Sequence, residues 1–133
     1  MKRVMKLTET LGIIKVVGTG THTILLNSDL LSPTQILSGP LGVGIAFITW
    51  STGGNIAISR NAENLYELFT NEGNFDLSGN GGFSDMTHAA SNINITITNG
   101  GTCILTLRKA TGYVSRIEPF RFGQYDDPTR VGA

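Results

Sequence analysis

The residues of this sequence that could do chemistry are few and scattered. It contains one cysteine, Cys103, and two histidines, His22 and His88. Cys103 alternates with Leu105 and Leu107 in "GTCILTLRK", which indicates a small core residue and not a reactive thiol. The histidines accompany neither a GxSxG motif nor another nucleophile signature. The sequence therefore predicts no catalytic residues and a protein that is not an enzyme.

Two loops match ligand-binding motifs only in part. "GTGTHT", residues 18–23, has glycines spaced as in a nucleotide-binding loop but lacks the third glycine and a following helix. "NFDLSGNGGFSD", residues 74–85, places Asn74, Asp76 and Asp85 loosely as in a calcium loop, without the bidentate glutamate or flanking helices. A strand followed by a glycine-rich loop explains it better. We expect no cofactor and no metal site.

The C-terminal segment is a candidate site of another kind. "IEPFRFGQYDDPTRVGA", residues 117–133, is too aromatic for a solvated tail, and its prolines and glycines disfavour a helix or a central strand. We predict an arm that packs on another chain; packing on its own domain is the alternative. The candidate partner-binding residues are Phe120, Arg121, Phe122, Tyr125, Asp126, Asp127 and Arg130.

Composition limits the class of protein. The 133 residues suffice for one domain, and ten basic residues balance ten acidic ones, so neither nucleic acid nor a membrane is an expected partner. Lys2, Arg3 and Lys6 form a small basic cluster that we interpret as a solvated strand end. The first residues lack the apolar region of a signal peptide, which predicts synthesis in a cytoplasm. A single cysteine excludes an intrachain disulfide.

Seventeen glycines and only 15% charged residues are typical of an all-β protein. We predict one antiparallel β-sandwich or jelly roll over residues 1–116, followed by the arm at 117–133; a closed barrel is the alternative. Eight to ten strands are expected. A short edge strand is expected at residues 34–37, and residues 61–82 could form either strands or a helical turn, with the Asn-Gly signals favouring strands.

Alternating apolar and polar residues predict three β-hairpins. In "NINITITNGGTCILTLRK", a loop of residues 99–101 keeps the apolar side chains on one face, whereas a two-residue loop mixes the faces. Loops at 52–54 and 18–20 follow the same logic. The expected pairs are Ile97 with Cys103, Ile95 with Leu105, Ile93 with Leu107, Trp50 with Ile56, Ile48 with Ile58, Ile14 with Ile24 and Val16 with His22. The expected core comprises Ile48, Trp50, Ile56, Ile58, Ile93, Ile95, Ile97, Cys103, Leu105 and Leu107.

The stretch "ITITNGGTCILTLRKATGYVSRIEPFRFGQYDDP" resembles the C-terminal part of small β-rich virion structural proteins of tailed bacteriophages. "GTGTHTILLNSDLL" and "IAISRN" are similar in style, without a motif that transfers residue by residue. The resemblance implies a capsid decoration (cement) protein that binds the major capsid protein or other virion proteins, forms a homo-oligomer and resides in the virion. A neck, tail or fibre component is the nearest alternative.

A carbohydrate-binding β-sandwich is a further alternative. Such modules use exposed aromatic rings as stacking platforms. Trp50 is the single tryptophan, and the strand register places it inward, so we expect no platform. A small β-fold enzyme is disfavoured because paired acid and base residues are missing.

Overall fold

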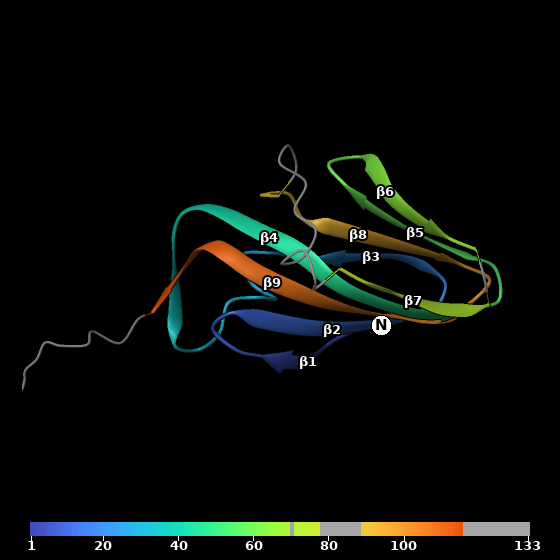
Figure 1. Cartoon of the computed structure of the whole chain (residues 1–133), viewed down its shortest axis with the longest axis horizontal. Helices are drawn as coiled ribbons and strands as arrows, with labels where there is room; N and C mark the ends of the chain where they lie inside the picture. Colours follow the sequence, from blue (N-terminus) through green and yellow to red (C-terminus); the bar gives the residue numbers. More distant parts are fainter. Residues whose placement is uncertain (70, 78–88, 116–133) are drawn as a thin grey trace, which may run out of the picture.

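Two antiparallel β-sheets pack face to face in the computed structural model, which describes residues 1–69, 71–77 and 89–115 (Figure 1). Sheet A has the strand order β1-β2-β9-β4-β7, and sheet B has the order β3-β8-β5-β6. The strands are β1 (Lys2–Leu7), β2 (Leu11–Val17), β3 (Gly20–Ile24), β4 (Gln35–Thr52), β5 (Asn55–Arg60), β6 (Glu63–Leu68), β7 (Glu72–Asp76), β8 (Ile93–Thr98) and β9 (Gly101–Ser115). The predicted all-β sandwich is confirmed. The strands form two separate sheets and not one closed barrel, which was the alternative.

The core lies between the sheets and matches the expected set. Its aliphatic side chains come from alternate positions of the strands, as the period of two requires. All ten predicted core residues are buried, and the most exposed of them, Trp50, is 8% exposed. Further buried apolar residues are Ile14, Val16, Ile24, Leu26, Leu30, Val43, Ile45 and Leu68.

The three predicted hairpins are wrong. β8 pairs with β3 and β5, whereas β9 pairs with β2 and β4, so Ile97 and Cys103 lie in different sheets. Likewise, Trp50 pairs with Cys103 and Gly73, and Ile56 pairs with Ile97 and Leu68. The expected pairs Ile95 with Leu105, Ile93 with Leu107, Ile48 with Ile58, Ile14 with Ile24 and Val16 with His22 are absent for the same reason.

Each of these turns carries the chain from one sheet to the other. Alternation determines which face of a strand is apolar, but it does not determine which strand lies beside it. A tight glycine turn can return the chain within one sheet or lead it across the interior, and both routes keep Ile97 and Cys103 inside. A tight hairpin does form between β5 and β6, through Asn61 and Ala62, whose φ angles of 50° and 65° suit a two-residue turn.

The three crossing turns lie together and bond to one another. The amide of Gly18 donates to the carbonyl of Gly101 at 3.0 Å, and the amide of Gly53 donates to the carbonyl of Gly100 at 3.4 Å. The amide of Gly100 donates to the hydroxyl of Thr19 at 2.8 Å. These bonds satisfy backbone groups at one end of the sandwich and fix the two sheets relative to each other.

Other elements follow the sequence more closely. A strand does begin near residues 34–37, but it is neither short nor an edge strand: it is the start of the 18-residue β4, which lies between β9 and β7 in sheet A. The pairing of β4 with β9 is interrupted after Leu37. The ambiguous region forms strands β6 and β7, as the turn signals favoured. The end of that region, residues 78–82, and the arm at 117–133 lie outside the described residues.

Trp50 fills the interior beside strand β7. A side chain at its cross-strand partner Gly73 would place a Cβ atom 2.7 Å from the indole, so glycine is required there. The ring centroids of Trp50 and Phe75 lie 5.6 Å apart. The indole thus occupies space that Gly73 leaves open and extends the core to the edge of sheet A.

Replacing this side chain tests the packing. Trp50→Ala should lower the free energy of unfolding by about 3–5 kcal/mol, because it leaves a large cavity between the sheets. Phe69→Ala is the matched control, since Phe69 is 67% exposed and its loss should change stability by no more than about 0.5 kcal/mol. Urea denaturation of both variants measures the difference. Equal stability of Trp50→Ala and wild type would contradict the packing described here.

Candidate protein-binding edges

The segment between β3 and β4, residues 25–34, closes one side of the sandwich, where sheet B has one strand fewer than sheet A. Leu26 and Leu30 are buried, and Leu30 packs against Gly12 of β2, where a side chain would collide with it. The phenol of Tyr113 donates to the carbonyl of Leu26. The segment therefore takes the place of a further strand.

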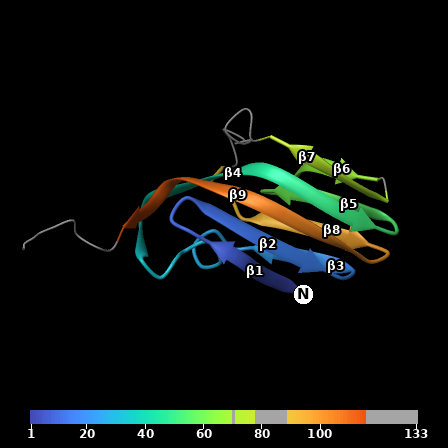
Figure 2. The same ribbon diagram turned by 60° about the horizontal axis from the view of Figure 1, so that its bottom comes forward.

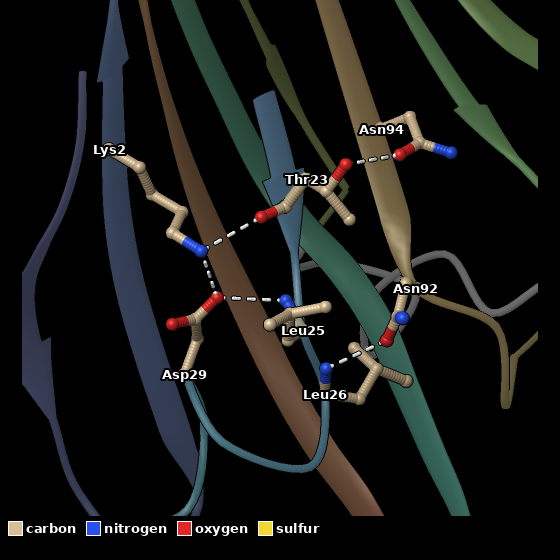
Figure 3. A network of polar contacts seen from close by, with 7 residues as sticks. All are labelled: Lys2, Thr23, Leu25, Leu26, Asp29, Asn92 and Asn94. Atoms are coloured by element: carbon tan, nitrogen blue, oxygen red, sulfur yellow. Dashed lines mark hydrogen bonds and ion pairs between the residues drawn. The ribbon is translucent and has the colours of Figure 1, made fainter. Parts of the chain in front are cut away.

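Polar contacts tie this segment to both sheets (Figure 3). The ammonium of Lys2 in β1 donates to the carboxylate of Asp29 at 2.6 Å and to the carbonyl of Thr23 at 2.9 Å. The amide of Leu26 donates to the side chain of Asn92 at 2.9 Å, and the carboxylate of Asp29 also accepts the amide of Leu25 at 2.8 Å. Because Lys2 belongs to sheet A and Thr23 to sheet B, its ammonium bridges the two layers.

Lys109 is a buried cation with a structural role. Its ammonium donates to the carbonyl of Leu30 at 2.7 Å and to the side chain of Gln35 at 2.6 Å, and it lies 4.9 Å from the ring centroid of Tyr113. Burial lowers the pKa of Lys109, and the charge of Glu9 opposes that shift.

A hollow of about 470 Å³ lies beside Lys109 and is lined by Thr10, Leu11, Arg108, Lys109 and Ala110. Since the ammonium is bonded to the fold, we assign it no ligand.

Arg60 is the second buried cation. It is 0% exposed, and its guanidinium donates to the carbonyls of Val43 at 2.7 Å, Ala89 at 2.7 Å and Ser91 at 2.9 Å. These carbonyls compensate part of the cost of burying the charge. Arg60 therefore anchors residues 89–91 to β4 and β5.

β1 forms one edge of sheet A and has the features of a binding surface. Among the described residues it pairs with β2 alone, and all its residues are exposed except the half-buried Leu7. Val4 is 38% exposed and Met5 is 53% exposed, and the pairing with β2 is interrupted between Val4 and Lys6. An exposed edge with apolar side chains can accept an extended segment of another protein as an additional strand.

The opposite side of the sandwich is closed by aromatic rings. Here β7 is the edge of sheet A and β6 is the edge of sheet B, both far from β1 (Figure 2). The ring centroids of Tyr66 in β6 and Phe75 in β7 lie 5.6 Å apart. A hollow of about 420 Å³ opens beside them, lined by Trp50, Glu67, Leu68, Phe69, Gly73, Asn74 and Phe75. Trp50 is buried as predicted, yet it forms one wall of an aromatic hollow that the register argument did not anticipate.

The structure places only some of the residues singled out in the sequence. The candidate partner-binding residues Phe120, Arg121, Phe122, Tyr125, Asp126, Asp127 and Arg130 lie outside the described residues. His88, Asp85 and the second half of the calcium-like loop lie outside them as well. Asn74 and Asp76 belong to strand β7. Within the described ranges, His, Cys, Asp and Glu form no group of three that could hold a metal ion.

Cys103 and His22 belong to the packed part of the sandwich. Cys103 is 0% exposed, and burial raises the pKa of its thiol to about 12, so it is a core residue as expected. His22 is half-buried in β3, where its ring nitrogen Nε2 lies 2.9 Å from the carbonyl of Gly18.

No protein-family model matches the chain, and no curated protein or solved structure is significantly similar to it. The described residues include no helix that could span a membrane. The assignment of a binding surface therefore depends on the geometry of the edges.

The sequence shows Lys2, Arg3 and Lys6 as a basic cluster but does not place them at a sheet edge, because edge positions follow from strand order.

The buried thiol predicts how stability depends on pH. Cys103 has an ordinary pKa of 9.0, which burial raises to about 12, so the unfolded chain loses this proton first. The stability associated with the protonated thiol is present below pH 9 and is lost as the pH rises toward 12. Burial also raises the pKa of Tyr113 from 10.0 to about 12, against the opposing charge of Arg60, and this adds to the loss. Each group can contribute a slope of up to about 1.4 kcal/mol per pH unit.

Urea denaturation between pH 8 and pH 11 measures this slope. Cys103→Ala should be less stable at pH 8 because of a small cavity, but its stability should fall less steeply with pH than that of the wild type. Parallel curves for the two proteins would show that the thiol does not titrate as its burial requires.

Proposed function

We propose that this protein is a non-enzymatic virion structural protein of the capsid decoration (cement) type, which binds the major capsid protein lattice and stabilises the particle. The observation that carries the proposal is the exposed edge strand β1, with Val4 and Met5 on a side of sheet A where no further strand of the described residues pairs. The resemblance of the chain to small virion proteins of tailed bacteriophages supports the same role.

The geometry suits β-strand addition. A partner segment beside β1 would form backbone hydrogen bonds along the edge, and its side chains would cover Val4 and Met5. The edge is held before binding, because β1 pairs with β2 and Lys2 is bonded to Asp29 and Thr23. A preformed edge reduces the ordering cost of association, and many copies on a symmetric lattice strengthen individually weak contacts.

Particles assembled from the genome that encodes this chain provide the test. Mass spectrometry of purified virions should detect the protein, and immunogold electron microscopy should place it on the capsid surface. Label on the neck, tail or fibres would instead support the nearest alternative, and absence of the protein from virions would overturn the proposal.

Removal of the arm tests its predicted role in binding. A chain that lacks residues 119–133 should melt close to the wild type, because every described strand ends before residue 116. It should bind particles less well, since the aromatic residues of the arm are the predicted contacts. Co-sedimentation with undecorated particles measures binding, and thermal melting is the control. Unfolding of the truncated chain would show that the segment packs on its own domain.

The aromatic hollow allows a direct test of the carbohydrate-binding alternative. A capsid decoration protein that binds only through β1 and its arm should show no specific binding on a glycan array. Specific binding that Phe69→Ala abolishes would favour the carbohydrate-binding module, because Phe69 is an exposed wall of the hollow.

A further inference from the structure

The charges of the two edges of sheet A are opposite. β1 carries Lys2, Arg3 and Lys6, and residues 1–7 contain no acidic side chain. Glu72 and Asp76 are exposed on β7, at the far edge of the same sheet. The adjacent strand β6 adds two more exposed carboxylates, Glu63 and Glu67, and residues 61–69 and 71–77 contain no basic side chain. The chain is therefore neutral in total but has one basic and one acidic side.

We infer that copies of this protein associate head to tail, with β1 of one copy beside β7 of the next. This inference rests on the proposed structural role and deepens it by naming β7 of a second copy, in place of a capsid segment, as the strand that pairs with β1 in the assembled lattice. The junction would continue sheet A from one copy into another. It brings Arg3 and Lys6 of one copy toward Glu72 and Asp76 of its neighbour.

Electrostatics disfavours the symmetric alternatives. Two β1 strands side by side would bring together the Arg3 and Lys6 side chains of both copies, while the charge of each Lys2 is compensated by Asp29 of its own copy. Two β7 strands would bring carboxylates together. Like charges on adjacent strands destabilise pairing, whereas opposite charges support it. The basic edge is thus suited to an acidic strand and not to itself.

The apolar residues of the two edges also match. Val4 and Met5 are 38% and 53% exposed on β1, and Phe75 is 42% exposed on β7. A junction between these strands would remove all three from water while the charged residues remain at its rim. Interfaces with an apolar centre and a polar rim are the common pattern for protein association.

Strand direction determines the form of the assembly. Successive antiparallel pairings from β1 through β2, β9 and β4 to β7 make β1 and β7 run in the same direction. Copies that keep the same sheet face outward therefore pair these strands in parallel. A repeated head-to-tail contact gives a ring if the rotation closes and a filament if it does not. Each junction is short, so a single contact is weak and depends on ionic strength.

A charge swap tests the inference on the purified full chain. Sedimentation velocity at low ionic strength should show wild-type oligomers that dissociate as salt is added. The β1 variant Arg3→Glu with Lys6→Glu and the β7 variant Glu72→Lys with Asp76→Lys should each be monomeric, because each has two edges of one sign. An equimolar mixture of the two variants should associate again, since the acidic β1 of one then meets the basic β7 of the other.

Controls separate misfolding from lost contacts. Each variant should melt close to the wild type, and the milder pair Arg3→Gln with Lys6→Gln should weaken association if a charge reversal destabilises the fold. Monomeric wild type at low salt, unchanged association of either charge variant, or a mixture that stays monomeric would each overturn the inference. None of these results affects detection of the protein in virions, so failure of this inference is distinguishable from failure of the proposed function.

Cross-linking identifies the strands at the junction. The double variant Met5→Cys with Asn74→Cys should form a ladder of disulfide-linked oligomers under mild oxidation, whereas each single variant should stay monomeric. The native Cys103 is fully buried and is not expected to react. A disulfide-linked dimer of Met5→Cys alone would show that β1 pairs with β1 and would overturn the head-to-tail arrangement.

Discussion

The crossing of the chain between sheets at three adjacent glycine turns is the constraint on which the rest of the structure depends. Because β2 to β3, β4 to β5 and β8 to β9 each change sheet, the two strands of each of these pairs lie in opposite sheets, on either side of the core. Gly101 shows why glycine is needed: its φ is +146°, and a Cβ atom there would lie 2.5 Å from the carbonyl oxygen of Ser51. The hydrogen bonds among the turns hold the two layers at one end.

The sides of the sandwich are closed by different means, as a consequence of unequal sheets. On the side of β1, residues 25–34 replace a strand, and the buried ammonium of Lys109 bonds to the carbonyl of Leu30 within that segment. On the side of β7, the rings of Tyr66 and Phe75 meet across the two sheets. These closures leave the edges of sheet A exposed, so the surfaces proposed for binding lie on a rigid framework.

Basic residues on β1 and acidic residues on β7 place opposite charges at the two edges of sheet A. A protein with one basic and one acidic edge can meet its own copies in a defined order while its total charge stays at zero. This property suits a protein that forms repeated contacts on a lattice, where geometry and number of contacts matter more than the strength of each. It also defines the chemistry of the strand that we propose beside β1, which is an acidic edge such as β7 of a second copy.

The sequence by itself determined the all-β class, the inward positions and the roles of single residues such as Trp50 and Cys103. Alternation and burial are local properties, since a strand's apolar face is apolar whatever strand lies next to it. It did not determine that Ile97 and Cys103 belong to different sheets, because pairing depends on contacts between residues distant in sequence. For the same reason, only the tertiary structure decided that Lys6 and Glu72 lie at opposite edges of one sheet. Strand order is a global property, and the candidate binding surfaces follow from it.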